Sequence, residues 1–186
     1  MEKIILIEPE KPENTGLIAR LAANYNTDLR IVKPDFNLSK ARKTANKYQD
    51  KLRNAKIFDS VQEAIQDLEF VVGTKPGKGS PLKKFHPREN MSIMIGRESS
   101  GLTNQELKHC DTVIHIETGK QSSLNQSHAT AVILHQFHNK EQGRINLDKL
   151  QPLQDDIGQV TMKLLKRSSP SNRELKALTA EIKQNN

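Results

Sequence analysis

Short apolar runs of strand length alternate with stretches of helical period along residues 3–137, and this alternation limits the folds open to the chain. The runs are of the buried-strand type and end in loops rich in Pro, Gly, Asn or Lys. They lie at Lys3–Ile7, Leu29–Val32, Lys56–Phe58, Glu69–Gly73, Ile93–Ile95 and Val113–Ile116. Strands that alternate with helices predict an α/β fold with a mostly parallel sheet flanked by helices.

The stretches between these runs carry helical periodicity. The apolar residues of Leu17–Tyr25 share one face, which predicts a helix with Asn14 as its cap and Arg20 at the edge of that face. From Ser39 to Arg53 an apolar stripe crosses a strongly basic segment, which predicts one amphipathic helix with a cationic outer face. Further helices are expected at these places: Ser60–Asp67, the residues after Thr103, the residues after Asn125 (with Ala129, Val132, Ile133 and Phe137 inward), and two in the tail after residue 151.

The composition favours a globular chain with an anionic partner. The 186 residues are 34% hydrophobic and 27% charged, with a formal net charge of +7. The positive charge favours nucleic acid as the partner, and the alternative is that it serves only to keep the protein in solution. No run of 18 apolar residues occurs and no signal peptide is recognised, so a cytoplasmic protein is expected. Cys110 is the single cysteine, so no disulfide framework or cysteine metal cluster is possible.

Three loops carry residues that suit ligand binding. Thr74–Arg88 is long and basic and contains no acidic residue. Gly96–Leu102 places Arg97 and Glu98 between glycines directly after a buried strand, where a ligand could approach the backbone closely. Ser123 and Asn125 precede the last core helix, either as simple helix caps or as functional residues. Such loops at strand ends, facing helix starts, are where α/β proteins bind nucleotides.

Several common functional motifs are missing. No phosphate-binding P-loop pattern is present, and Gly77-Lys-Gly79 lacks the third glycine and the following helix of a dinucleotide fingerprint. His128, His135 and His138 are expected to be structural or surface residues rather than metal ligands, so no metal site is predicted. The residues alone therefore indicate a nucleotide-binding α/β enzyme of unspecified reaction.

Three motifs, in order, resemble the SpoU/TrmH branch of the SPOUT RNA methyltransferases. Asn14–Arg20 (Asn-Thr-Gly-Leu-Ile-Ala-Arg) is similar to the first, Ile95–Leu102 (Ile-Gly-Arg-Glu-Ser-Ser-Gly-Leu) to the second, and Ser123–Ser127 (Ser-Leu-Asn-Gln-Ser) to the third. Arg42–Ala45 and Val72–Thr74 resemble the TrmJ-like subgroup. The family's first motif helix usually ends in Phe-Gly, whereas this chain has Tyr25-Asn26, and Asn tolerates the left-handed conformation that Gly would supply.

The resemblance implies a SPOUT methyltransferase domain over residues 1–150, with a deep C-terminal trefoil knot, and a short C-terminal helical extension over residues 151–186. It also implies a homodimer and S-adenosyl-L-methionine as cofactor. The implied reaction is 2′-O-methylation of a ribose in RNA. A pyrimidine of a tRNA anticodon loop is the expected target, and ribosomal RNA is the second choice. A non-catalytic RNA-binding protein on the same fold is the alternative from another class.

The same resemblance implies roles for individual residues. The catalytic or structural motif positions are Arg20, Glu98, Ser123 and Asn125. Cofactor binding is expected at Thr74, Lys75, Pro76, Gly96, Gly101, Ile116, Ser122, Ser123 and Leu124. RNA binding is expected at Asn14, Arg20, Arg42, Lys43, Lys78, Lys83 and Lys84.

Arg20 is the residue expected to act on the target ribose. Removing the proton from a guanidinium at neutral pH would cost roughly 7 kcal/mol, which is a large demand on one site. Holding the target phosphate and stabilising the developing alkoxide demands much less. We therefore expect Arg20 to act as an electrostatic organiser rather than as a general base.

Overall fold

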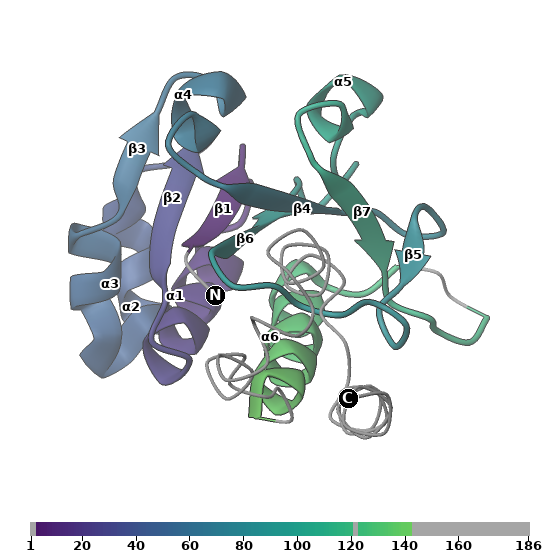
Figure 1. Cartoon of the computed structure of the whole chain (residues 1–186). Helices are drawn as coiled ribbons and strands as arrows, with labels where there is room; N and C mark the ends of the chain where they lie inside the picture. The colour runs from purple at the N-terminus through teal and green to yellow at the C-terminus, as the bar shows by residue number, and fades with distance from the viewer. Residues whose placement is uncertain (1–2, 121–122, 143–186) are drawn as a thin grey trace, which may run out of the picture. The chain divides into compact units, whose positions relative to one another are not determined.

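The computed structural model describes residues 3–120 and 123–142. Seven strands form one sheet in the order β3-β2-β1-β6-β4-β7-β5 (Figure 1), and every pair of neighbouring strands in it is parallel. The strands are β1 (Lys3–Ile7), β2 (Asp28–Val32), β3 (Lys56–Phe58), β4 (Phe70–Thr74), β5 (Ser80–Pro81), β6 (Met91–Ile95) and β7 (Thr112–His115). The predicted α/β class with a mostly parallel sheet is confirmed.

Helices cover both faces of this sheet. The helical elements are α1 (Pro12–Asn24), η1 (Leu38–Ala41), α2 (Arg42–Ala45), η2 (Asn46–Tyr48), α3 (Gln49–Arg53), α4 (Val61–Ile65), α5 (Asn104–Leu107) and α6 (Gln126–Gln142). In β1, Ile4 and Leu6 pack with buried residues of α1, α2, α3 and α6, whereas Ile5 and Ile7 pack with those of α4 on the opposite face. Because both faces of β1 are buried, its run is apolar throughout instead of alternating.

The start of α1 differs from the prediction. Asn14 does not cap this helix, because α1 begins at Pro12 and Lys11 occupies the cap position. Proline suits the first helical position, since its fixed φ matches the helix and its missing N–H would have no helical partner. Asn14 lies inside the first turn and is 5% exposed, so its side chain is available for contacts within the protein. The turn after α1 follows the prediction, since Asn26 adopts a φ of 48°.

The basic segment after β2 is not the single amphipathic helix that its periodicity predicts. It consists of η1, α2, η2 and α3, and the chain breaks at Asn46, where φ is 53°. Three of the four residues of the apolar stripe, Ala41, Ala45 and Leu52, are at most 3% exposed, and the fourth, Tyr48, is half-buried. Tertiary packing against α1 therefore holds the stripe in place without continuous helical hydrogen bonding.

Two further expectations need correction. The basic stretch Thr74–Arg88 is not wholly irregular, because β5 adds an edge strand to β7. On α6, Ile133 and Phe137 are buried as predicted, but Val132 is 42% exposed and Leu134 takes the inward position. The helices expected after residue 151 lie outside the described residues. Within the described residues, none of the helices is both long and apolar enough to span a membrane.

Gly16 sets the distance between α1 and the basic segment. A Cβ at this position would lie 2.4 Å from the carbonyl oxygen of Ala41 and 2.7 Å from Cβ of Thr44. The backbone of the basic segment could not remain where it is. We expect Gly16→Ala to lower the free energy of unfolding by about 1–3 kcal/mol, as measured by urea denaturation.

Gly119→Ala is the matched control. A Cβ at Gly119 meets no atom within 4 Å, so the same added methyl group should leave stability within about 0.5 kcal/mol. Equal stability of the Gly16→Ala variant and the wild type would contradict the close packing of α1 on α2.

Candidate active site

A pocket of about 200 Å³ lies at the carboxyl ends of three neighbouring strands, β6, β4 and β7. The loop after β6 and the first turns of α6 also contribute to it. The lining residues come from four segments: 74–76, 95–101, 114–116, and Ser123, Leu124, Gln126, Ala129 and Ile133 at the start of α6. The carboxyl edge of a parallel sheet is where open α/β folds bind their ligands.

The pocket has an apolar floor and a polar mouth. Ile95, Ile114 and Ile133 are at most 4% exposed, while Ser99 and Ser123 are exposed. A pocket divided in this way suits a ligand with a flat apolar ring at one end and a polar tail at the other.

Two glycines shape the loop after β6. A Cβ at Gly96 would lie 2.1 Å from the carbonyl carbon of Gly101, so no other residue fits at this position. Gly101 has a φ of +66°, which favours glycine, and its N–H donates to the carbonyl of Arg97 at 3.0 Å. The loop therefore folds back on itself directly beside the pocket.

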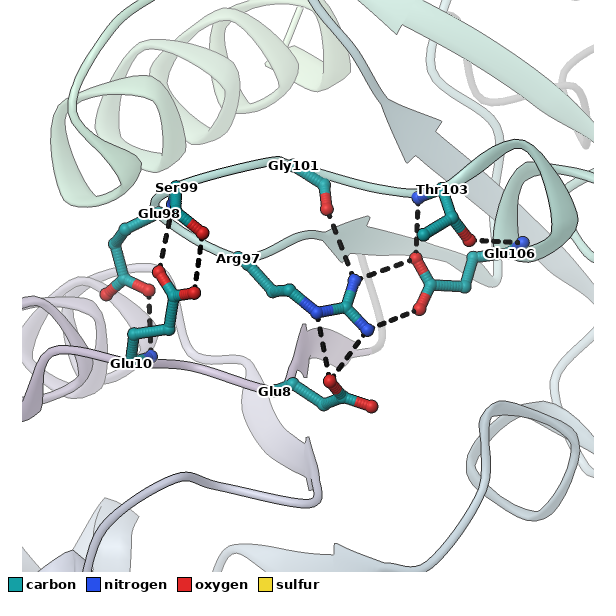
Figure 2. Close-up of polar contacts among 8 residues, drawn as sticks. All are labelled: Glu8, Glu10, Arg97, Glu98, Ser99, Gly101, Thr103 and Glu106. Atoms are coloured by element: carbon teal, nitrogen blue, oxygen red, sulfur yellow. Dashed lines mark hydrogen bonds and ion pairs between the residues drawn. The ribbon is translucent and has the colours of Figure 1, made fainter.

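The guanidinium of Arg97 joins three segments (Figure 2). Its Nε donates to Glu8 at 2.9 Å, and its two terminal nitrogens donate to both carboxylate oxygens of Glu106 at 3.2 and 2.9 Å. Glu106 also accepts from the backbone N–H of Thr103 at 2.7 Å, within the capping box of α5. Hydrogen bonding to Glu106 raises the pKa of Arg97, against the opposing effect of burial. Arg97 is therefore a structural cation that fixes the loop.

Burial and hydrogen bonding act in opposite directions on Glu106. Burial raises the pKa of this carboxyl group, but the hydrogen bonds from Arg97 and from Thr103 outweigh burial and leave the pKa below its ordinary value. Glu106 therefore remains a carboxylate at neutral pH, and the pair with Arg97 keeps its charges.

The loop after β1 and the loop after β6 exchange hydrogen bonds. Glu98 accepts from the backbone N–H groups of Glu10 at 2.9 Å and Lys11 at 3.2 Å. In return, Glu10 accepts from the N–H of Ser99 at 2.9 Å and from its hydroxyl at 2.6 Å (Figure 2). Hydrogen bonds from Ser99 lower the pKa of Glu10. We call the set Glu8, Glu10, Arg97, Glu98 and Ser99 the carboxylate clasp.

A chain of side-chain amides extends this clasp to α6. Asn14 donates from Nδ2 to Glu98 at 3.1 Å and accepts at Oδ1 from Nδ2 of Asn125, also at 3.1 Å. Asn125 then accepts at Oδ1 from the N–H of Ser127 at 2.9 Å and from its hydroxyl at 2.8 Å. Asn125 therefore caps α6, as one of the two readings predicted, and also belongs to the network. One residue from each of the three sequence motifs meets in this chain.

The predicted cofactor-binding residues that the structure describes all line the same pocket. The pocket is lined by Thr74, Lys75, Pro76, Gly96, Gly101, Ile116, Ser123 and Leu124, and also by Glu98. Ser122 lies outside the described residues. The hydroxyl of Thr74 donates to the carbonyl of Met94 at 3.1 Å, and the ammonium group of Lys75 contacts the carbonyl of Leu102.

Arg20 does not line this pocket. It lies six residues after Asn14 on α1, which places it about 120° away around the helix. It is exposed, and among the described residues it makes no hydrogen bond or ion pair. Its guanidinium is therefore free to meet a ligand that approaches from solvent.

The predicted RNA-binding cations lie on separate segments. Arg42 and Lys43 are exposed on α2, beside α1. Lys78, Lys83 and Lys84 are exposed on the stretch that holds β5. Lys78 donates to Asn104 at 2.7 Å, and Lys83 forms an exposed ion pair with Glu117 at 2.7 Å. Exposed pairs of this kind cost little to open, so the two lysines can still bind phosphates.

Sequence reasoning did not assign roles to Glu8, Glu10 and Gln126. Glu8 and Glu10 come directly after the buried strand β1, and two carboxylates at that place are the signal that could have indicated a site. Gln126 is 6% exposed and donates to the carbonyl of Gly96 at 2.8 Å. Its place beside Asn125 could have been read as a second cap, and nothing in its spacing indicated burial.

Within the described residues, no group of three or more His, Cys, Asp or Glu side chains is placed to hold a metal ion. The thiol of Cys110 lies beside Gly73 and Met94, and burial raises its pKa to about 12. Cys110 is therefore protonated at neutral pH and is half-buried.

The fold and the pocket define a parallel α/β protein with a pocket suited to a nucleotide-like ligand at the carboxyl edge of its sheet. Residues 2–135 match the SpoU rRNA Methylase family. This match covers most of the chain, so the protein belongs to that family, and the resemblance seen in the three motifs is confirmed.

Named relatives support this membership. A tRNA (cytidine-2′-O-)-methyltransferase TrmJ of Methanocaldococcus jannaschii is 36% identical over 159 residues, which cover 76% of this chain and 69% of that protein. A tRNA (cytidine/uridine-2′-O-)-methyltransferase TrmJ of Cronobacter sakazakii is 33% identical over 153 residues, covering 72% of this chain and 61% of that protein. A solved structure described as giving insights into the 2-OH methylation of C/U34 on tRNA is 27% identical, with a TM-score of 0.71, and covers 77% of this chain and 98% of that chain.

Asn14 donates to Glu98 and accepts from Asn125, whereas a carboxylate at this position could only accept. We expect Asn14→Asp to lower the free energy of unfolding by about 2 kcal/mol or more, because two carboxylates would then meet and the hydrogen bond to Glu98 would be lost. Urea denaturation at pH 7 measures this effect. The loss should shrink at lower pH, where the two carboxyl groups can share a proton.

Asn37→Asp is the control for the same chemical change. Asn37 caps η1 and its Oδ1 only accepts, from the N–H of Ser39 at 2.9 Å. An aspartate performs that function equally well, so this variant should keep wild-type stability. Equal effects of the two substitutions would contradict the directed amide chain.

Proposed function

We propose that this protein transfers a methyl group from S-adenosyl-L-methionine to the 2′-hydroxyl of a ribose in tRNA. One observation carries the proposal: the three motifs are joined by hydrogen bonds beside a pocket that suits a nucleotide. The residues that join them are Asn14, Glu98 and Asn125. Membership of the SpoU rRNA Methylase family and the names of the TrmJ relatives support the same reaction.

The pocket fits an adenosyl group. Its floor of buried isoleucines suits the ring, and the cradle at Gly96, which a Cβ would fill, lets backbone groups approach a ligand closely. Thr74, Ser123 and backbone groups near the mouth offer neutral hydrogen-bonding partners for the polar part. When bound, the cofactor supplies an activated methyl group on a positively charged sulfur.

The protein's own residues then have to place the ribose. The amide chain holds the start of α1 and the start of α6 against the rim, and thus fixes the walls between which the ribose must enter. Arg20, exposed on α1, would hold a phosphate beside the target and stabilise the developing negative charge on the 2′-oxygen. A base role would require burial that favours a neutral guanidine, so exposure favours the electrostatic role.

The target class follows from the relatives. Two of them are named for cytidine or uridine 2′-O-methylation of tRNA, and one solved structure concerns C/U34 of tRNA. We therefore propose a pyrimidine ribose in the anticodon loop as the target. The two alternatives are methylation of ribosomal RNA and RNA binding without catalysis, and the transfer assay distinguishes both from methylation of tRNA.

The finer structural expectations are part of the same proposal. A deep trefoil knot over the C-terminal part of the sheet domain is supported by family membership and by the position of β6 between β1 and β4. A homodimer would allow the exposed Arg20 of one copy to reach the pocket of another. A tRNA substrate favours a cytoplasmic location.

Arg20→Lys should lose most of the methyl transfer to tRNA, about 100-fold or more, because the forked geometry of the guanidinium is lost while its charge is kept. The measurement is transfer from labelled cofactor to total tRNA and to ribosomal RNA, with nucleoside analysis of the product. Arg53→Lys, at an exposed residue paired with Asp50, is the control and should keep wild-type activity.

The outcomes separate the alternatives. A 2′-O-methylated pyrimidine nucleoside from tRNA, lost in Arg20→Lys, supports the proposal, whereas a product from ribosomal RNA alone contradicts the tRNA assignment. Cofactor binding without transfer to either RNA contradicts the activity. The absence of cofactor binding favours the non-catalytic RNA-binding protein.

Binding of tRNA should weaken steeply with salt, because exposed cations replace the counterions of phosphates. The double variant Arg42→Ala/Lys43→Ala should reduce the slope of log affinity against log salt by between about 1 and 2. Fluorescence anisotropy with labelled tRNA at several salt concentrations measures the slope. Lys56→Ala, at an exposed lysine on the edge strand β3, should leave it unchanged, and an unchanged slope in the double variant would exclude α2 from the RNA surface.

A further inference from the structure

The side chain of Gln126 has one satisfied end and one unsatisfied end. Its Nε2 donates to the carbonyl of Gly96 at 2.8 Å, which fixes the orientation of the amide. Its Oε1 is buried and has no hydrogen-bond partner among the described residues. The hydroxyl groups of Thr15 and Ser92 are also buried without a partner in that part of the chain, but neither residue lines the pocket, whereas Gln126 does.

A buried acceptor without a partner costs about 1–3 kcal/mol, so a folded chain rarely keeps one without a use. Gln126 is the first residue of α6, and Ala129 and Ile133 follow one and two turns later on the same side of the helix. Both also line the pocket. Gln126 thus brings an unpaired side-chain acceptor to the wall of the pocket that Ala129 and Ile133 also line.

We propose that Oε1 of Gln126 accepts a hydrogen bond from the exocyclic amino group of the cofactor's adenine ring, so that Gln126 selects a 6-aminopurine over other purines. This inference rests on the proposed use of S-adenosyl-L-methionine. Gln126 lies within the third motif, but the resemblance to the family gave it no role, so the inference adds a specificity-determining residue.

The chemistry of the floor selects the adenine amino group from among the donors of the cofactor. The ammonium group of the methionine part carries a full charge, and burying it against a neutral amide between isoleucines would be costly. The ribose hydroxyls are strongly hydrated and suit the polar mouth. The aromatic amino group is neutral and is carried by a flat ring, which can enter the apolar floor and satisfy Oε1 at the same time.

The test compares ligands and variants together. The ligands are S-adenosylhomocysteine, the same molecule with hydrogen in place of the purine 6-amino group, and 5′-methylthioadenosine, which lacks the amino acid part. The proteins are the wild type, Gln126→Met, and Gln136→Met as a matched control on the same helix outside the pocket. Isothermal titration calorimetry gives the dissociation constants, and circular dichroism confirms that each variant is folded.

The wild type and Gln136→Met should bind S-adenosylhomocysteine at least tenfold more tightly than the 6-unsubstituted analogue, since the analogue leaves Oε1 unpaired. Gln126→Met should lose this discrimination. It should also bind 5′-methylthioadenosine more weakly than the wild type does, because this ligand keeps the 6-amino group and lacks only the amino acid part. A ratio between the two purines is insensitive to a general loosening of α6 by the substitution, because both ligands would be affected alike.

Three results would overturn the inference while leaving the proposed function intact. The first is equal binding of both purines by the wild type, and the second is unchanged discrimination in Gln126→Met. The third is equal binding of 5′-methylthioadenosine by the wild type and Gln126→Met, which would assign Oε1 to the amino acid part of the cofactor. A wild type that binds none of the three ligands would instead contradict the proposed cofactor.

Discussion

The carboxylate of Glu98 is the constraint on which the site depends. Because β1 and β6 are neighbouring parallel strands, the loops that follow them leave the sheet at the same edge, and both carry glutamates. Side by side, these carboxylates would repel each other. The chain avoids this by giving each carboxylate donors from the other loop: backbone N–H groups for Glu98, Ser99 for Glu10, and Arg97 for Glu8. Charges that would separate the loops hold them together instead.

This arrangement couples two helices that come from distant parts of the chain. Asn14 is held by Glu98 and in turn holds Asn125, so the first turn of α1 and the first turn of α6 share one directed hydrogen-bond chain. In the proposed reaction, α1 carries the residue that meets RNA, and α6 contributes a wall of the cofactor pocket. The hydrogen-bond chain thus connects the helix proposed to meet RNA with a helix that lines the pocket.

Much of this architecture could be predicted from the sequence, because buried parallel strands leave a clear pattern of apolar runs. Ile4 and Ile5 lie on opposite faces of the sheet, yet both are fully buried, as a continuous apolar run predicts. The break at Asn46 could not be predicted, since periodicity reports which residues face inward but not whether the backbone between them is continuous. The network of Asn14 was also missed. A local cap and a contact across 111 residues use the same amide groups, and only the fold decides between them.

The charged side chains around the pocket form ion pairs and hydrogen bonds within the protein. Arg97 is neutralised by Glu8 and Glu106, Glu98 is held by N–H groups, Glu10 is held by Ser99, and Lys75 contacts a carbonyl. A sulfonium loses its positive charge as its methyl group leaves. A carboxylate free to approach it would therefore stabilise the bound reactant more than the transition state and slow the reaction. Hydrogen bonds from the neighbouring loop hold the carboxylates of Glu98 and Glu10 in place. In the proposed reaction, the cation that the developing alkoxide needs would come from outside the pocket, from Arg20.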